Sequence, residues 1–260
     1  MPSPMQPLTS EALRSVRLIA SDMDGTLTQR GKFTPLLLQT LTDLANAGIP
    51  VVIVTGRSAG WVSGLVHYLP VAGAIAENGG CFFSASGAKE QLVSLADVLQ
   101  HRQQLAQMFA ELQAEFPQIQ VSDDNAFRLS DWTFDVQGLT TAELQHMSKR
   151  CYEQGWGFTY STVQCHIKLL RQEKSIGLQT VLERYFPQYS SAEIVTVGDS
   201  PNDESLFNPE WFPCSVGVAN VQHYAEHMTH RPTYITTAPE VQGFCELTAL
   251  LLSLSGDFRR

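Results

Sequence analysis

The chain has 260 residues, enough for one large domain or two modest ones. Apolar residues make up 43% and charged residues 17%, which excludes disorder as the main state because so apolar a chain favours a packed core. Lys and Arg number 17 against 26 Asp and Glu, a formal net charge of −9, so we expect neither nucleic acid nor an anionic membrane as a partner.

Short apolar runs alternate with amphipathic stretches over the first 80 residues. Residues 16–20 are predicted to form a strand, and residues 37–44 carry leucines at helical spacing. The runs at 50–54 and 71–76 are continuously apolar, which is typical of strands buried on both faces of a parallel sheet. This rhythm predicts an α/β fold with a doubly wound sheet.

The pattern changes after Gly80. Long helices are predicted at 99–116 and from 141 to about 154. Strands are predicted between and after them, at 126–129, 132–136, 158–161 and 166–170. Such a mixture favours a small α+β domain that leaves one face of its sheet exposed.

The first rhythm then returns, with predicted helices at 175–186 and 241–252 and predicted strands at 193–197 and 214–218. We therefore expect a discontinuous core made of residues 1–81 and 173–260, a Rossmann-like doubly wound parallel sheet. Residues 82–172 are expected to form an inserted α+β domain.

The five cysteines are scattered and form no Cys-x-x-Cys pair, which disfavours a disulfide framework and a zinc site. No apolar run reaches the roughly 18 residues of a membrane-spanning helix. The first ten residues carry three prolines and lack the apolar stretch of a secretory signal. We expect a cytoplasmic protein that does not enter a membrane, and the oligomeric state is left open.

Three polar segments begin where a predicted strand stops, at residues 22–26, 55–57 and 198–203. In an open parallel sheet the ligand crevice lies beyond the carboxyl ends of the strands, so these segments should converge there. Four carboxylates would then share a small volume: those of Asp22, Asp24, Asp199 and Asp203. Like charges disfavour this arrangement unless a cation offsets them. Oxygen ligands with no His or Cys nearby select Mg²⁺, which also takes a substrate phosphate.

The spacing of Asp22 and Asp24 suits covalent catalysis. Two carboxylates two residues apart in a loop at a strand end can face one substrate, one as nucleophile and the other as general acid and base. Read alone, the segment is equally compatible with a polar turn.

Four motifs in order remove much of that ambiguity, because they resemble those of the haloacid dehalogenase superfamily of phosphohydrolases. They are Asp22-Met23-Asp24-Gly25-Thr26-Leu27, Thr55-Gly56-Arg57, Lys174 and Gly198-Asp199-Ser200-Pro201-Asn202-Asp203. One departure is that the common Lys-Gly pair of the family is replaced by Lys174-Ser175, with Gly177 two positions later.

The resemblance implies a role for each catalytic position. Asp22 is similar to the nucleophile that forms an aspartyl-phosphate, and Asp24 to the acid that protonates the leaving alcohol and then activates water. Lys174 would neutralise the nucleophile and the phosphoryl oxygens. Asp199 would be the main Mg²⁺ ligand, beside the Asp22 carboxylate and the Asp24 backbone carbonyl. Asp203 would orient Lys174 or the metal ligands from the layer of residues around the direct contacts.

The resemblance and the position in the crevice together assign the phosphate and substrate contacts to Met23, Thr55, Gly56, Arg57 and Asn202. These assignments suit phosphoryl transfer, which depends mainly on positioning and charge neutralisation.

The position of the inserted domain in the chain indicates a subgroup of this superfamily. The stretch between Asp22 and Thr55 is too short for a sizeable cap domain, whereas the stretch between Thr55 and Lys174 has room for one. An α+β cap there resembles the type IIB caps of Cof-type, sucrose-phosphate and mannosylphosphoglycerate phosphatases. The Ser200-Pro201 pair favours the mannosylphosphoglycerate branch.

Specificity should come from cap residues that face the core. Arg128, His166 and Lys168 lie on predicted cap strands and could hold a sugar or a second anionic group, although packing of His166 and solvation of Lys168 are the simpler interpretations. Asn78 lies in a Glu-Asn-Gly turn where type IIB chains leave the core, and is either a hinge or a substrate contact.

The predicted function is a Mg²⁺-dependent phosphatase that hydrolyses a small phosphorylated metabolite, most simply a sugar phosphate or a phosphorylated glycoside. Two alternatives remain: a phosphotransferase similar to phosphomannomutases, and a non-catalytic sugar-phosphate binding module, which the intact Asp22 disfavours. A dehalogenase is disfavoured by the presence of Asp24.

Overall fold

The structure, a computed structural model, describes residues 4–257 and contains two sheets. Within these residues the large sheet has nine strands, in the spatial order β1 (Gln6–Pro7), β12 (Tyr234–Ile235), β11 (Cys214–Gly217), β10 (Ile194–Gly198), β2 (Leu18–Ser21), β3 (Val51–Val54), β4 (Gly73–Ala76), β5 (Cys81–Ser84) and β6 (Lys89–Gln91). Neighbouring strands are parallel from β1 to β4, and β5 and β6 are added antiparallel. The predicted α/β class with a mostly parallel sheet is confirmed.

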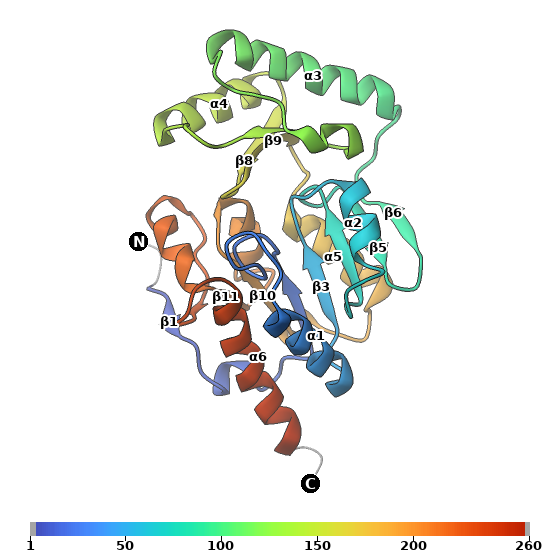
Figure 1. The fold of residues 1–260 in the computed structure, drawn as a ribbon, viewed down its shortest axis with the longest axis vertical. Coiled ribbons are helices and arrows are strands. Elements are labelled where there is room, and N and C mark those ends of the chain that lie inside the picture. Colours follow the sequence, from blue (N-terminus) through green and yellow to red (C-terminus); the bar gives the residue numbers. More distant parts are fainter. Residues whose placement is uncertain (1–3, 258–260) are drawn as a thin grey trace.

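Helices cover both faces of this sheet (Figure 1). They are α1 (Pro35–Ala47), α2 (Ala59–Leu65), α5 (Lys174–Tyr185) and α6 (Glu240–Asp257). Successive strand residues point to opposite faces, so Ile19 packs in one apolar cluster with α1, α2 and α6, while Leu18 and Ala20 pack in another with α5. The strand residues are apolar on both faces because both faces are covered.

The smaller sheet has three antiparallel strands, β7 (Trp132–Asp135), β9 (Gln164–Leu169) and β8 (Trp156–Tyr160), among the residues described. Helices α3 (Val98–Glu115) and α4 (Thr141–Glu153) pack on one of its faces, around Phe134 and Ile167. They lie on the side away from the large sheet, so the other face of the small sheet looks toward the core (Figure 1).

Short 3₁₀ helices link these elements: η1 (Glu11–Leu13), η2 (Asp123–Phe127), η3 (Ser191–Glu193), η4 (Pro201–Phe207), η5 (Ala219–His223) and η6 (Ala225–His227). Of the helices in the described part of the chain, none combines the length and the apolar composition needed to cross a bilayer.

Two sequence predictions are corrected. No strand forms at 126–129: η2 ends at Phe127 and Arg128 follows it, because the Asn125 side chain donates to the backbone carbonyls of Ser122 and Thr133 and holds the chain in a tight turn. The insert was expected to begin at residue 82, but β5 and β6 extend the core sheet and Phe82 packs in its apolar cluster. The chain therefore leaves the core only after Gln91.

Candidate active site

The predicted motifs meet at one edge of the large sheet. Asp22 follows β2, Thr55 follows β3 and Asp199 follows β10. Ser21 of β2 is in register with Val197 of β10 and with Ile53 of β3, so the residues after these strands lie side by side. The parallel register therefore brings the three polar segments together, as the sequence predicts.

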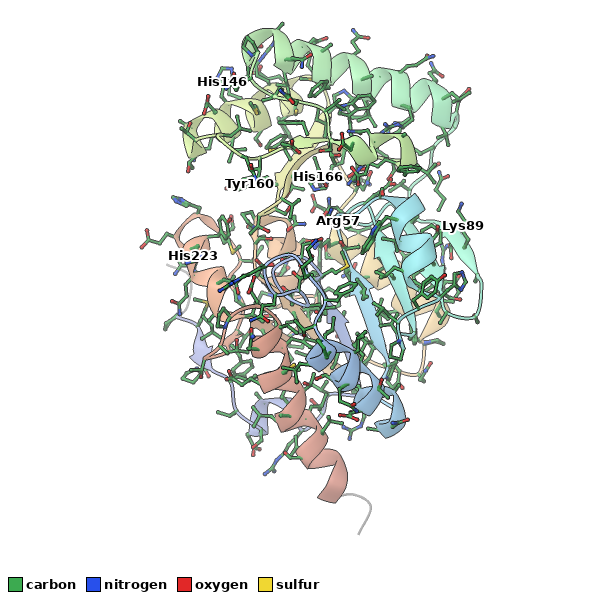
Figure 2. All side chains as sticks on the ribbon, in the orientation of Figure 1. Arg57, Lys89, His146, Tyr160, His166 and His223 are labelled. Atoms are coloured by element: carbon green, nitrogen blue, oxygen red, sulfur yellow. The ribbon has the colours of Figure 1, made fainter. Side chains whose placement is uncertain are left out.

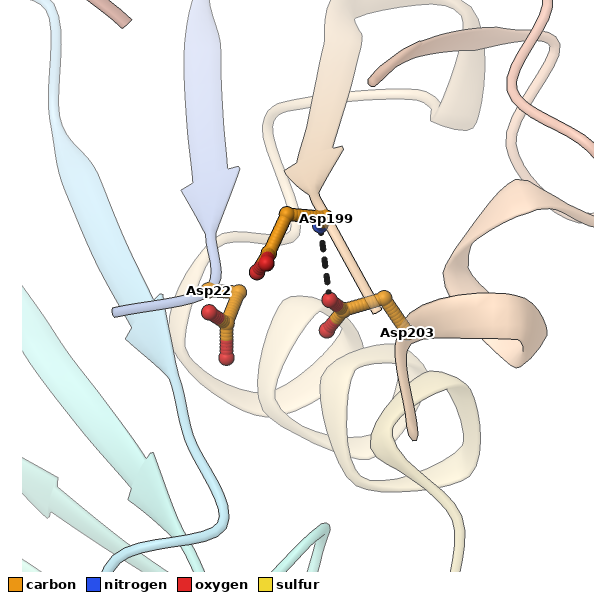
Figure 3. Close-up of side chains that lie close together, drawn as sticks. All are labelled: Asp22, Asp199 and Asp203. Carbon is orange, nitrogen blue, oxygen red and sulfur yellow. Dashed lines mark hydrogen bonds between the residues drawn. The ribbon is translucent and has the colours of Figure 1, made fainter. Parts of the chain in front are cut away.

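Three carboxylates form a compact buried cluster at this edge (Figure 3). Asp22, Asp199 and Asp203 each offer an oxygen within 4.8 Å of the others. Burial and the neighbouring carboxylates raise the pKa of Asp22 to about 7 and that of Asp199 well above its usual range. Within the described residues, the Oδ2 atom of Asp22 is buried without a hydrogen-bond partner. Clustered oxygen ligands, one of them free, fit a divalent cation such as Mg²⁺.

Lys174 supplies a positive charge to the cluster from the first residue of α5. Its Nζ lies 2.5 Å from Asp22 Oδ1 and 2.6 Å from Asp203 Oδ1. Burial lowers the pKa of the Lys174 ammonium, but the carboxylates of Asp203 and Asp22 outweigh it and hold this pKa above its usual value. The ammonium therefore stays charged in the buried site.

Asp203 is already fully engaged with the protein. Its Oδ1 atom accepts from Lys174, and its Oδ2 atom accepts from the backbone N–H groups of Asp199 (2.9 Å) and Ser200 (3.1 Å) at the start of η4. Asp203 thus orients Lys174 and the Asp199 loop. Asp22 and Asp199 are the carboxylates left to face a metal.

Asp24, the expected general acid, is held in an ion pair. Its two oxygens accept from Arg57, from Nε at 2.8 Å and from Nη2 at 2.6 Å. This hydrogen bond is the main reason why the pKa of Arg57 lies above its usual value. In this arrangement both Asp24 oxygens are occupied by Arg57.

A cavity between the sheet edge and the small sheet contains most of the predicted contacts. Its lining consists of Asp22, Asp24, Gly56, Arg57 and Asn202 from the core, Gln164 and His166 from β9, and Ser161 and Val163 from the turn between β8 and β9. Figure 2 labels His166 on the small-sheet side of this region and Arg57 on the core side. The side chain of Met23 instead packs in the apolar core, so its predicted substrate contact is not made by that side chain.

Thr55 and Asn202 make local hydrogen bonds beside the cavity. Thr55 Oγ1 accepts from the backbone N–H of Arg57 at 3.1 Å, which shapes the second motif. Asn202 donates to Oδ1 of Asn78 at 3.1 Å. Asn78 adopts a positive φ of 52° in the turn after β4, and its Nδ2 group is buried and unpaired among the described residues. The turn thus brings Asn78 to the active-site edge.

Two of the cap candidates donate hydrogen bonds to other protein groups. Every guanidinium nitrogen of Arg128 donates to the protein, including Nη1 to the backbone carbonyl of Gly56 at 2.9 Å. Arg128 follows η2 rather than lying on a strand, and it links the small domain to the second motif. Lys168 is buried and donates to the Gln172 carbonyl (2.6 Å) and to Glu173 (2.5 Å), so it is neither solvated nor directed at the cavity.

Sequence reasoning missed two partners of Asp199. Its carboxylate accepts from Thr26 Oγ1 at 3.2 Å and from Asn220 Nδ2 at 2.8 Å. A Cβ atom on Gly25, whose φ is +87°, would lie 2.5 Å from Asp199 Oδ2, so this position requires glycine. Asn220 follows β11 at the same sheet edge. Its place just after a predicted strand was the sequence signal that could have identified it as a site residue.

Comparison with known proteins agrees with these features. Residues 19–154 match the family model of the haloacid dehalogenase-like hydrolases. A phosphoglycolate phosphatase of Metallosphaera sedula is 27% identical over 212 residues, which cover 79% of this chain and 87% of that protein.

Solved structures share the fold. One protein of Thermoplasma acidophilum superposes with a TM-score of 0.72 at 19% identity, covering 92% of this chain and 99% of the other. The C-terminal domain of the C. albicans trehalose-6-phosphate phosphatase superposes with a TM-score of 0.70 at 14% identity, covering 98% and 99%. The chain belongs to the haloacid dehalogenase-like hydrolases and is an enzyme of the phosphatase class, as the order of its four motifs predicted.

Proposed function

We propose that this enzyme is a Mg²⁺-dependent phosphatase that hydrolyses a phosphomonoester of a small metabolite through an aspartyl-phosphate on Asp22. The observation that carries the proposal is the Asp22 carboxylate. One of its oxygens is held by Lys174, and the other is buried beside the cavity without a protein partner in the described residues. Such an oriented carboxylate is suited to attack phosphorus.

Hydrolysis then takes two balanced steps. In the first, an Asp22 oxygen forms a bond to phosphorus while the bond to the leaving oxygen breaks, and protonated Asp24 gives its proton to the leaving alcohol. In the second, water attacks the aspartyl-phosphate, Asp24 takes a proton from that water, and phosphate leaves Asp22. The Lys174 ammonium, 2.5 Å from Asp22, offsets negative charge in both steps.

The proposed Mg²⁺ would be held by the carboxylates of Asp22 and Asp199, with the Asp24 backbone carbonyl added by resemblance to the family. When bound, it would neutralise charge on the phosphoryl oxygens. Thr26 and Asn220 orient the Asp199 carboxylate for this role through their hydrogen bonds.

Opening of the Arg57–Asp24 pair is part of this proposal. The pair is partly exposed, with 31% of the Arg57 side chain accessible, so an incoming anionic group can compete for the guanidinium. Arg57 would then contact substrate, and Asp24 would be released to carry a proton.

The substrate class is proposed as a sugar phosphate or a similar small phosphorylated metabolite. Relatives named phosphoglycolate phosphatase and a structural neighbour named trehalose-6-phosphate phosphatase support a small phosphate ester. A phosphotransferase would use the same Asp22 but pass the phosphoryl group to another alcohol, and a binding module would release no phosphate at all.

The Asp22→Asn variant tests the covalent step. It keeps the size of the side chain and removes the nucleophile, so we expect phosphate release from p-nitrophenyl phosphate to fall to background and acid-stable ³²P labelling of the protein to disappear. Asp43→Asn is the matched control, because Asp43 is exposed on α1 and contacts Gln39 there. Turnover that survives in Asp22→Asn would contradict the mechanism, and wild-type activity unaffected by EDTA would contradict the metal.

A further inference from the structure

A histidine–aspartate pair of the small domain faces the catalytic cavity. The Nδ1 atom of His166 lies 2.9 Å from Oδ2 of Asp131, and both side chains are buried. His166 is in β9, where its neighbours Cys165 and Ile167 pack in the apolar cluster under α3 and α4. Because side chains alternate along a strand, His166 points to the opposite face, and it lines the cavity that contains Asp22.

The imidazole ring of His166 packs against Gly56 in the Thr55-Gly56-Arg57 motif. A Cβ atom added to Gly56 would lie 2.9 Å from His166 Cε1 and 3.0 Å from Nε2, so the ring occupies the space that a side chain would fill. Arg128 fixes this arrangement, because its Nη1 atom donates both to Asp131 (2.9 Å) and to the Gly56 carbonyl (2.9 Å). The ring is therefore held in a constant position relative to the Gly56 backbone.

The partner of Nδ1 decides what Nε2 can do. Although burial raises the pKa of the Asp131 carboxyl, Arg128 and His166 outweigh it and keep this pKa below its usual value. Asp131 is thus an ionised carboxylate that only accepts hydrogen bonds, so Nδ1 carries the hydrogen. Burial lowers the pKa of His166 and, with the charges of Arg128 and Lys174, outweighs Asp131, which raises it, so the neutral ring is favoured.

The second nitrogen of the ring is left available. No group in residues 4–257 forms a hydrogen bond with Nε2 of His166. In a neutral ring protonated on Nδ1, Nε2 has a lone pair and accepts a hydrogen bond. An unpaired acceptor that faces the cavity containing Asp22 is available to a donor on a bound ligand.

We propose that Nε2 of His166 accepts a hydrogen bond from a hydroxyl of the leaving group, and that the enzyme thereby selects phosphate esters of hydroxylated alcohols. Asp131 is a positioning residue that sets the tautomer and the direction of the ring. This inference rests on the proposed phosphatase function and deepens it, because it names the chemistry of the alcohol.

The test compares two esters that differ only in hydroxyl groups, glycerol 1-phosphate and propyl phosphate, with Mg²⁺ present. We expect the wild type to prefer the glycerol ester. In His166→Phe, which keeps an aromatic ring but has no acceptor, we expect kcat/KM for glycerol 1-phosphate to fall by about ten- to a hundredfold, because the hydroxyl loses its partner. The value for propyl phosphate should change by about twofold or less, since that ester never used the acceptor.

Two further variants separate recognition from folding. His166→Gln keeps an acceptor oxygen and should recover part of the preference for the glycerol ester. His146→Phe is the control, because His146 is exposed on α4 and contacts Glu115 away from the cavity. It should leave both values unchanged.

The outcomes are distinguishable. Equal losses on both esters in His166→Phe, or a wild type without preference between them, would overturn this inference while the phosphatase function stands. A wild type that releases phosphate from neither ester nor from p-nitrophenyl phosphate would overturn both.

Discussion

Lys174 offsets the charge repulsion within a cluster of buried carboxylates. Its ammonium touches Asp22 and Asp203 at 2.5 and 2.6 Å, at a point where burial raises the pKa of Asp22 and Asp199. A buried charge without a partner is costly, and in the proposed mechanism the same ammonium would offset charge as Asp22 receives a phosphoryl group. If the proposed mechanism holds, stability and catalysis depend on the same contact.

Replacing Lys174 by Met should affect both properties. We expect turnover of p-nitrophenyl phosphate to fall by about a hundredfold or more, because a positioned charge at the phosphoryl oxygens is lost. Two buried carboxylates would also lose their cation, and we expect a loss of about 3–5 kcal/mol in the free energy of unfolding of the metal-free protein. Urea unfolding and steady-state kinetics measure the two effects.

The matched control is Lys149→Met, on the exposed surface of α4, with 76% of its side chain accessible. It should leave kinetics and stability close to those of the wild type, because an exposed ion pair contributes about 0–1 kcal/mol. Wild-type turnover in Lys174→Met would contradict the role given to this charge.

The turn after β4 is where the two sheets are tied together. Glu77 has a positive φ of 52°, and its carboxylate accepts from the backbone N–H groups of Ala59 (2.9 Å), Leu129 (3.0 Å) and Ser130 (2.7 Å). Gln172 donates to its carbonyl at 2.6 Å. The Glu77 side chain therefore joins the start of α2 to the segment before β7, and its backbone carbonyl adds Gln172 of the segment between β9 and α5.

Glu77→Gln tests this junction. The amide keeps the shape but replaces one acceptor oxygen by a donor that faces N–H groups, so we expect a loss of about 1–3 kcal/mol in the free energy of unfolding. Glu183→Gln, on the exposed side of α5, should be neutral. If urea unfolding gives equal stabilities for the two variants, the junction does not depend on this carboxylate.

The whole molecule carries a net charge of −9, yet the charge that governs function is local. Buried carboxylates and Lys174 form the site where we propose that a cation and a phosphate bind together, and the global balance does not predict such a site. The proposed metal binding would consequently be coupled to the protonation of the acidic cluster.

This coupling predicts a pH dependence. In the metal-free protein the pKa of Asp22 is raised to about 7, so the folded state keeps a proton that the unfolded chain releases near pH 4. The stability contributed by this group is present at low pH and is lost as pH rises through about 7. Because Mg²⁺ would replace that proton, we expect the increase in Tm on adding Mg²⁺ to be larger at about pH 8 than at about pH 5.5.

Differential scanning calorimetry with and without Mg²⁺ measures this difference. Asp199→Asn should reduce the shift at both pH values, whereas Asp43→Asn should preserve it. A Mg²⁺ shift that is independent of pH would contradict the coupling.

Part of the fold and of the site could be predicted because it depends on local pattern. Continuous apolar runs predicted β3 and β4, leucine spacing predicted α1, and the acids at strand ends predicted the cluster of Asp22, Asp199 and Asp203. These inferences succeed because parallel strands bring their carboxyl ends to one edge, whatever the remaining details of the fold.

Sequence alone determined the family, the α/β class and which acids share the catalytic edge, since each follows from residue type and order. Tertiary structure alone decided that β5 and β6 belong to the core, that Arg57 holds Asp24, and that His166 faces the cavity with Asp131 behind it. The physical reason is that these features are pairings between residues distant in the chain. A hairpin or a charged side chain is locally compatible with several partners, and only packing of the whole molecule selects one.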